Sequence, residues 1–343
     1  MRTALIVGVA GTALTSKERD FLKEVRPAGL ILFARNLESH AQIRALTDAM
    51  REAVGETELL VLIDQEGGRV QRLRTPLGRA LPPAAAYGRL RAQDPEAARA
   101  AAFAIARLLA EDLMALGVNT DCAPVLDVPV PGSHAIIGDR AYGTAPEPVV
   151  DLGRAVAEGF MAGGVLPVIK HIPGHGRATK DSHLALPVVT EERAELAATD
   201  FAPFKALNTM PAAMTAHVVF SAIDPDQPAS TSEIVTREII RGEIGFDGLL
   251  MSDDLSMKAL SGAMRARAER VIAAGSDIVV HCNGDFAEMQ AAAAGSPPLQ
   301  GAALSRFEAA LGVLNGRKPF DAAAAEGHLA RVLALAAGGA ESV

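Results

Sequence analysis

The stretch VLPVIKHIPGHG, residues 165–176, decides the fold of this chain of 343 residues. Its first five residues form an apolar run that is too short for an amphipathic helix, and the polar pair Lys170-His171 follows directly. A short run that is apolar on both of its faces is typical of a parallel strand covered by helices. We therefore interpret this stretch as a buried strand whose end leads polar side chains into a loop.

The same pattern recurs along the chain, where short apolar runs alternate with helical stretches. We expect strands at residues 3–9, 28–34, 59–64, 118–126, 165–170, 212–219, 248–252 and 276–281, and helices at residues 17–25, 39–54, 95–116, 146–162, 191–207, 232–241 and 257–274. Alternation of this kind, repeated about eight times, indicates either a closed barrel or a doubly wound sheet. The GVAG sequence after the first strand lacks the GxGxxG spacing of a dinucleotide-binding turn, which favours the barrel. We therefore expect one α/β domain, a (β/α)8 TIM-type barrel over residues 1–343 with an Ala-rich helical tail from Asp321.

Helix caps and long loops complete the expected layout. Ser16 and Thr190 are each followed by acidic residues in the first turn of an expected helix, as is usual after an N-cap. Residues 73–95, with several prolines, and residues 128–145 are expected to be long loops with little regular structure. Residues 174–184 lack strand or helix periodicity, and we expect them to form a mobile loop that closes over a ligand.

Composition and charge narrow the classes of function. Hydrophobic residues make up 49% of the chain and charged residues 22%, which is enough to bury a large core. The formal net charge of −8, without a cluster of Lys or Arg, argues against nucleic acid and membrane surfaces as partners. The apolar start is interrupted by Gly8 and Gly11, and no run of about 18 apolar residues occurs, so we expect neither a secretory signal nor a membrane helix. Cys122 and Cys282 lie far apart in sequence, which indicates a reducing compartment and a cytoplasmic location.

Polar residues gather at the ends of five expected strands. The groups are Asp64-Gln65-Glu66, Lys170-His171, Thr215-Ala216-His217, Ser252-Asp253-Asp254 and His281-Cys282-Asn283. In a barrel these strand ends converge on one face, where the active sites of such folds form. Together the groups predict a single site on that face.

Several residues near these strand ends also have structural interpretations. Asp64 fits a helix cap or an ion pair as well as a site, and for Glu66 we favour a structural role. Arg69 and Arg72 fit solvated positions, although a loop over the barrel mouth favours at least one of them as a ligand clamp. His175 lies between two glycines and fits loop ordering as well as catalysis.

Two acidic patterns are more specific. Asp253 and Asp254 are adjacent, so on an extended segment only one can face the pocket, and we expect the other to cap the following helix. In the triplet Asp181-Ser182-His183 the first and third side chains of an extended segment point the same way. The carboxylate can then orient and polarise the imidazole, as in other acid/base dyads.

A zinc site is the competing interpretation of the polar strand ends. Its ligands would come from His171, His175, His183, His217 and Asp253. No HxH ends the first strand, however, and no HExxH occurs in the chain. We therefore expect no metal site and no cofactor.

Taken together, IDQEGGRVQRL (63–73), KHIPGHGRATKDSHLALP (170–187), MTAHVVF (214–220) and LLMSDDLSMKAL (249–260) resemble glycoside hydrolase family 3. The resemblance covers about residues 1–315 and is strongest to its one-domain bacterial β-N-acetylglucosaminidases of peptidoglycan recycling. It implies that Asp253 is the catalytic nucleophile and that His183 is the general acid/base, with Asp181 as its dyad partner. It also implies that the sugar hydroxyls are bound by Asp64, Arg72, Arg140, Lys170 and His171.

The implied activity is that of a retaining exo-β-N-acetylglucosaminidase that forms a covalent glycosyl-enzyme on Asp253. The implied substrates are peptidoglycan fragments such as N-acetylglucosaminyl-anhydro-N-acetylmuramic acid, with or without peptide. Two alternatives stay open at this point. One is a β-glucosidase or β-xylosidase of the same family, which the Asp181-Ser182-His183 triplet disfavours. The other is a non-catalytic sugar-binding barrel, which the presence of Asp253 and the dyad disfavours.

Overall fold

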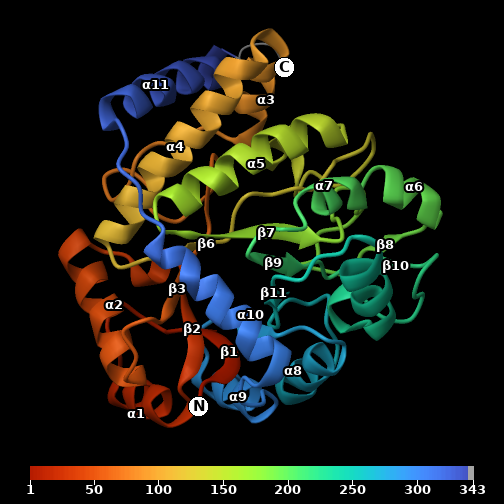
Figure 1. The fold of residues 1–343 in the computed structure, drawn as a ribbon. Helices are drawn as coiled ribbons and strands as arrows, with labels where there is room; N and C mark the ends of the chain where they lie inside the picture. Colours follow the sequence, from red (N-terminus) through yellow and green to blue (C-terminus); the bar gives the residue numbers. More distant parts are fainter. Residues whose placement is uncertain (339–343) are drawn as a thin grey trace.

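The computed structural model describes residues 1–338 and contains a closed barrel of eight strands (Figure 1). Each strand pairs in parallel with its two neighbours, and the last strand closes on the first. The barrel strands are β1 (Thr3–Gly8), β2 (Pro27–Leu32), β3 (Leu60–Ile63), β6 (Thr120–Asp121), β7 (Leu166–Ile172), β9 (Ala212–Thr215), β11 (Leu249–Asp254) and β12 (Ile278–His281). The predicted TIM-type barrel is thereby confirmed, and each expected strand overlaps one of the barrel strands. The strands expected at residues 118–126 and 212–219 are shorter than predicted. Residues 339–343 of the expected domain lie outside the described residues.

Side chains alternate between two hydrophobic clusters along each barrel strand, because successive residues of a strand point to opposite faces. Ile6, Val168 and Val280 belong to the cluster that fills the barrel, whereas Leu5 and Ile169 belong to the cluster shared with the surrounding helices. This double burial explains why the strands are apolar at nearly every position.

One helix closes the barrel at the end where its strands begin. Helix α10 (Gly301–Gly312) contributes Phe307 to the interior cluster, and the Arg2 guanidinium lies 5.0 Å from the centre of that ring. The opposite end of the barrel, where the strands finish, is therefore the end that can hold a site.

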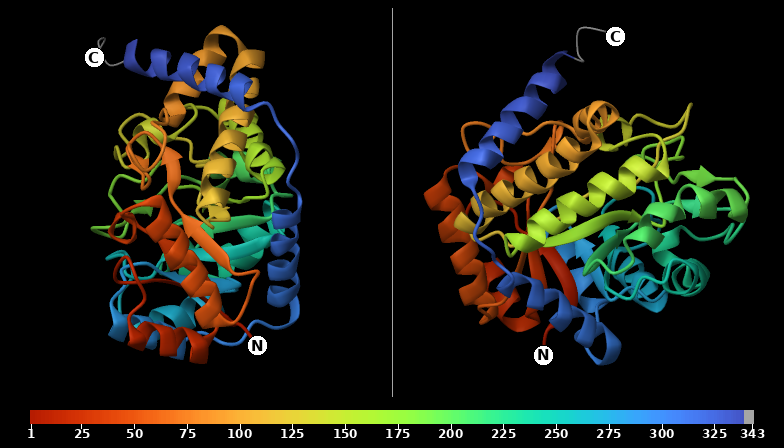
Figure 2. Two further views of the ribbon diagram at one scale, coloured as in Figure 1. Left: turned by 90° about the vertical axis from the view of Figure 1, so that its left-hand side faces the viewer. Right: turned by 45° about the horizontal axis from the view of Figure 1, so that its top comes forward.

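Four of the expected helices match the structure to within one residue. These are α1 (Ser16–Val25), α2 (His40–Val54), α4 (Pro95–Ala115) and α5 (Pro146–Ala162). After β12 the chain adds α9 (Phe286–Ala294), α10 and the expected tail helix α11 (Ala322–Gly338). Figure 2 shows α11 lying against α4 and α3 (Ala84–Gln93), at a distance from the barrel strands.

The predicted loop at residues 73–95 was wrong in its second half, which forms helix α3. Pro83 stands immediately before the helix, where its fixed backbone angle is compatible with a helix start, and the prolines obscured the apolar spacing of Ala86, Tyr87 and Leu90. Before this loop, β4 (Gln65–Gly67) and β5 (Val70–Gln71) form a small hairpin. The other predicted loop, residues 128–145, holds only the short 3-10 turn η2 (Gly138–Arg140).

Three expected helices differ from the structure. The helix expected at 191–207 is two helices, α6 (Arg193–Ala198) and α7 (Phe201–Ala206), because Pro203 has no N–H to donate to the preceding turn. The helix expected at 257–274 is α8 (Met264–Ala273), which begins after Gly262, whose φ of +88° is not helical. The helix expected at 232–241 is a π-helix, η4 (Val235–Glu243).

Both expected helix caps were also wrong. The N-cap of α1 is Thr15, one residue before the expected Ser16, and Thr15 and Glu18 form a reciprocal capping box. Thr190 does not cap a helix, because α6 begins after Glu192. The remaining short elements are η1 (Ala34–Asn36), η3 (Ala229–Thr231), η5 (Val313–Asn315), β8 (Val188–Val189) and β10 (Val219–Phe220). Within residues 1–338 no helix has the length and apolar character needed to cross a membrane.

Candidate active site

A cavity of about 290 Å³ opens at the end of the barrel where the strands finish. Seven of the eight residues to which the resemblance assigns a role line it, namely Asp64, Arg72, Arg140, Lys170, His171, His183 and Asp253. The eighth, Asp181, does not line the cavity but accepts a hydrogen bond from the ring Nδ1 of His183. Asp64, which directly follows β3, thus meets residues from β7, β11 and three loops in one cavity, although these segments are far apart in sequence.

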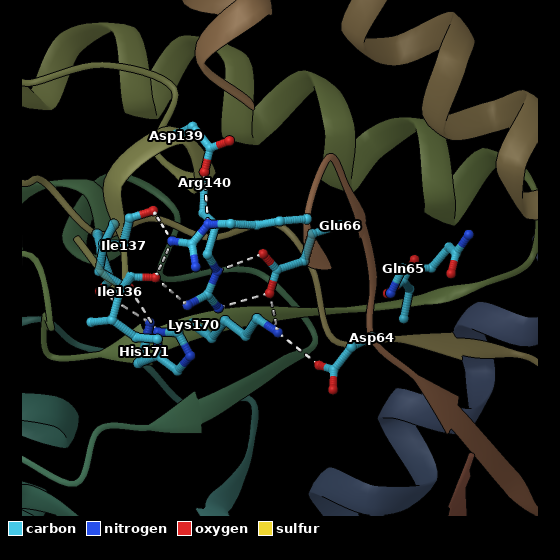
Figure 3. A network of polar contacts seen from close by, with 12 residues as sticks. Asp64, Gln65, Glu66, Ile136, Ile137, Asp139, Arg140, Lys170 and His171 are labelled. Atoms are coloured by element: carbon cyan, nitrogen blue, oxygen red, sulfur yellow. Dashed lines mark hydrogen bonds and ion pairs between the residues drawn. The ribbon is translucent and has the colours of Figure 1, made fainter. Parts of the chain in front are cut away.

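An ion-pair network forms one wall of this cavity (Figure 3). The Lys170 ammonium lies 2.9 Å from one carboxylate oxygen of Asp64 and 2.7 Å from one of Glu66. The second oxygen of Asp64 accepts from Arg72 at 2.8 Å. Arg140 donates two hydrogen bonds of 2.8 Å to the two oxygens of Glu66. Glu66, for which the sequence favoured a structural role, therefore holds both Arg140 and Lys170 in place while it lines the cavity.

Each member of this network is charged at neutral pH. Burial by itself would raise the pKa of Asp64, but Lys170 and Arg72 outweigh it and hold that pKa well below its usual range. Burial likewise opposes the ionisation of Glu66, yet Arg140 and Lys170 lower its pKa to about 2. Burial would lower the pKa of Lys170, and Asp64 and Glu66 raise it instead. The wall is thus a preorganised array of charged donors and acceptors, which suits the hydroxyl groups of a polar ligand.

Arg69 and Arg72 have different roles in the structure. Both line the cavity, and the Arg72 guanidinium lies 4.9 Å from the centre of the Phe33 ring and donates to Asp64. Arg69 donates instead to three backbone carbonyls, those of residues 135, 136 and 137, and to the Asp139 carboxylate. Arg69 therefore orders the loop that carries Arg140, and Arg72 is the one whose position fits a ligand clamp.

Asp253 is the carboxylate at the end of β11. One of its oxygens accepts the Asp254 backbone N–H at 2.8 Å. Burial would raise the pKa of Asp253, but electrostatic interaction with His217 and His171 and the hydrogen bond from the Asp254 backbone N–H lower it, so the carboxylate is ionised at neutral pH.

The expectation that Asp254 caps a helix and faces away from the pocket was wrong. Both Asp253 and Asp254 line the cavity, and the following helix begins only at Met264. The Asp254 carboxylate accepts from the backbone N–H groups of Ser256 and Cys282, each at 3.0 Å, and from the Ser256 hydroxyl. The Asp254 carboxylate therefore holds the turn after β11 against the end of β12, whereas the Asp253 carboxylate accepts fewer hydrogen bonds.

Asp127 is a residue of the site that the sequence reading missed. It is fully buried, and its carboxylate accepts from the His171 ring Nδ1 at 2.7 Å and from the backbone N–H groups of His171 and His175 at 3.2 and 2.7 Å. The sequence does contain a pattern that could have predicted this residue, because Asp127 follows the apolar pair Val125-Leu126 after β6, just as Asp64 follows β3.

The Asp181–His183 dyad is formed as expected from the triplet. Asp181 accepts from the His183 ring Nδ1 at 2.8 Å and from the His183 backbone N–H at 2.9 Å. Burial would raise the pKa of Asp181, but these two contacts lower it. The His183 side chain is 63% exposed, and its Nε2 has no hydrogen-bond partner among residues 1–338.

The loop that carries the dyad, residues 174–184, is anchored along its first half, and its closure over a ligand stays a prediction. Residues 174–178 are buried, and Arg177 donates to Asp200 at 2.6 Å. The His175 ring Nε2 contacts the Ser182 hydroxyl at 3.1 Å, and burial lowers the pKa of His175 to about 4, so this ring is neutral and orders the loop. In the second half of the loop, residues 179, 180, 183 and 184 are exposed, whereas Ser182 is buried.

Two further observations bear on the chemistry of the site. Burial raises the pKa of Asp121 to about 8, and its Oδ2 has no hydrogen-bond partner among residues 1–338. Within the same residues no group of three or more His, Cys, Asp and Glu side chains is arranged to hold a metal ion.

Comparison with known proteins places the chain in a family. Residues 5–297 match the model of the glycosyl hydrolase family 3 N-terminal domain. A β-hexosaminidase from Alkalilimnicola ehrlichii is 44% identical over 286 residues, which are 81% of this chain and 80% of that protein. Native NagZ from Neisseria gonorrhoeae superposes with a TM-score of 0.84 at 33% identity and covers 98% of this chain and 97% of its own. A β-N-acetylglucosaminidase from Paenibacillus gives a TM-score of 0.78 at 33% identity over 97% of this chain, which spans 60% of that protein. These matches confirm the resemblance that the motifs indicated, and the chain belongs to glycoside hydrolase family 3.

Proposed function

We propose that this protein is a retaining exo-β-N-acetylglucosaminidase. The observation that carries the proposal is the placement of an ionised carboxylate, Asp253, and a histidine dyad, Asp181–His183, at one polar cavity. The names of its relatives support it, since they include β-hexosaminidases and a β-N-acetylglucosaminidase. A NagZ crystal structure holding N-trifluoroacetyl-D-glucosamine adds support for an aminosugar ligand.

In the first step the Asp253 carboxylate attacks the anomeric carbon and the glycosidic bond breaks. The proton on His183 Nε2 passes to the leaving oxygen, so the leaving group departs as an alcohol. In the second step water attacks the same carbon, gives a proton back to Nε2 and releases Asp253. Two displacements at one carbon return the original β-configuration, which is the retaining outcome.

The dyad replaces the second carboxylate that most retaining glycosidases use. Asp181 accepts the Nδ1–H of His183 and thereby leaves Nε2 as the nitrogen that exchanges protons with substrate. The negative charge of Asp181 also stabilises the imidazolium that the first step requires.

The charged wall binds the sugar in this proposal. Asp64 accepts from hydroxyls, Arg72, Arg140 and Lys170 donate to them, and His171 contacts a hydroxyl through its free ring nitrogen. A cavity of about 290 Å³ is small, which favours a single terminal sugar over an internal segment of a chain.

For the natural substrate we propose peptidoglycan fragments such as N-acetylglucosaminyl-anhydro-N-acetylmuramic acid, with or without peptide, in the cytoplasm. This substrate rests on the resemblance of the motifs to one-domain β-N-acetylglucosaminidases, and the compartment rests on the two widely separated cysteines.

The discriminating experiment compares two chromogenic substrates. We expect 4-nitrophenyl N-acetyl-β-glucosaminide to be cleaved with a kcat/KM far above that of 4-nitrophenyl β-glucoside. A preference for the glucoside would favour a β-glucosidase of the same family. Absence of turnover with either, in a folded protein that still binds N-acetylglucosamine, would favour a non-catalytic sugar-binding barrel.

A further inference from the structure

Asp127 is a fully buried carboxylate beside the cavity, and none of the proposed chemical steps uses it. Its Oδ1 accepts two backbone N–H groups, those of His171 at 3.2 Å and His175 at 2.7 Å. Its Oδ2 lies 2.7 Å from Nδ1 of the His171 ring. The three contacts tie the segment after β6 to the segment that ends β7.

The charge of Asp127 determines which ring nitrogen of His171 carries the proton. Burial would raise the pKa of Asp127, but His171 and His175 lower it, so the carboxylate is ionised and can only accept. A ring nitrogen at 2.7 Å from such an oxygen must be protonated. In the neutral imidazole the proton therefore lies on Nδ1, and Nε2 carries a lone pair.

The lone pair on Nε2 of His171 is available to a ligand in the cavity. His171 lines the cavity, and its Nε2 has no hydrogen-bond partner among residues 1–338. Its chain neighbour Lys170 supplies only donors, as Figure 3 shows for the ammonium beside Asp64 and Glu66. A ligand hydroxyl between the two residues can accept from Lys170 and donate to His171, which satisfies both of its hydrogen-bonding roles.

We propose that Asp127 is a positioning residue that holds His171 in the Nδ1–H tautomer, so that the His171 Nε2 accepts a hydrogen bond from a substrate hydroxyl. The part of this inference that concerns the substrate rests on the proposed function. The tautomer itself is a property of the free protein and can be measured without substrate.

Asp127→Asn is the most direct test of this proposal, because asparagine has the same shape as aspartate but carries no charge. The two backbone N–H groups require the amide oxygen at the Oδ1 position, so the amide nitrogen of the variant must face His171 Nδ1. An amide nitrogen donates, and His171 can then accept only through an unprotonated Nδ1. The proton moves to Nε2, and the hydrogen bond from the substrate hydroxyl is lost.

The experiment records two-bond ¹H–¹⁵N correlations of the full chain with labelled histidine, at an alkaline pH where free imidazoles are neutral. The chain has 8 histidines, and His171→Gln identifies the signals of His171 by their absence. We expect a protonated Nδ1 in the natural sequence and a protonated Nε2 in Asp127→Asn. The kcat/KM for 4-nitrophenyl N-acetyl-β-glucosaminide should fall by roughly 3- to 10-fold in Asp127→Asn, mainly through KM, as expected for one neutral hydrogen bond.

Asp200→Asn is the matched control. Asp200 is also a buried carboxylate that supports the loop after β7, through Arg177 at 2.6 Å, but it does not line the cavity. This variant should lower thermal stability and leave His171 protonated on Nδ1.

Three results would overturn the inference. The first is an Nε2–H tautomer in the natural sequence, which stands as a test even where Asp127→Asn fails to fold. The second is an unchanged tautomer in Asp127→Asn, and the third is a changed tautomer with unchanged kcat/KM. A protein with the expected tautomer that cleaves no aminosugar glycoside would instead contradict the proposed function.

Discussion

Replacement of His183 by Ala separates the two halves of the proposed mechanism. The His183 side chain is 63% exposed, and the only hydrogen bond of its ring among residues 1–338 is to the Asp181 carboxylate. Truncation of an exposed side chain changes the free energy of unfolding by about 0.5 kcal/mol or less. Any large loss of rate in His183→Ala is therefore chemical rather than structural.

The magnitude depends on the leaving group. A sugar alkoxide is a poor leaving group and needs the proton from His183, and general acid catalysis of this kind contributes roughly 10²- to 10⁴-fold. A nitrophenolate departs without a proton, so formation of the glycosyl-enzyme from a nitrophenyl glycoside should slow by less than about 10-fold. The second step still needs His183 as the base, so the intermediate should accumulate.

Rapid-mixing kinetics measures both steps. We expect His183→Ala to release a burst of nitrophenol equal to the enzyme concentration, followed by slow turnover, and to cleave a natural disaccharide roughly 10²- to 10⁴-fold more slowly than the unaltered protein. His40→Ala, which alters an exposed histidine of α2 whose Nε2 contacts the Leu77 carbonyl, is the control and should show neither effect. Equal slowing of the burst and of disaccharide cleavage would refute the acid/base role of His183.

Three other variants test the site and its electrostatics. Asp253→Asn should lower kcat by about 10⁴-fold with the fold intact, and a fluorosugar inactivator should label Asp253; a label on Asp254 would show that the wrong carboxylate was chosen. Glu66→Gln leaves Arg140 without its charged partner at a position where the Glu66 side chain is only 7% exposed. The free energy of unfolding should therefore fall by roughly 3 kcal/mol, and an unchanged Tm would contradict this. The raised pKa of Asp121, about 8 when folded against an ordinary value near 3.8, means that the folded state binds a proton that the unfolded state has released. Stability should therefore decline as pH rises from about 4 to about 8, and Asp121→Asn should reduce that decline in urea titrations; parallel pH profiles for the two proteins would refute it.

The local pattern of apolar runs with polar residues at their ends was sufficient to predict the barrel and the residues where its strands finish. Each strand is buried on both faces, so its apolar run is visible in the sequence without knowledge of its neighbours. Lys170 and Asp253 stood out because a charged residue at the end of such a run is costly unless it faces a partner or a pocket. Helix α3 and the break at Pro203 were missed because prolines can begin a helix as well as end one, and only the packing of Tyr87 and Leu90 decides which.

The contacts among the loops could not be predicted from the sequence. Asp127 and His171 are 44 positions apart, and Glu66 and Arg140 are 74 apart. Their meeting depends on barrel closure, which brings the loops after β3, β6 and β7 together at one mouth. The sequence by itself determined which strands form and which chemical groups stand at their ends, because strand burial and residue type are local properties. Only the tertiary structure decided which carboxylate pairs with which cation, because pairing is set by distance and burial in three dimensions. Asp64, Glu66 and Asp127 hold other side chains, whereas Asp253, the proposed nucleophile, accepts only the Asp254 backbone N–H among residues 1–338.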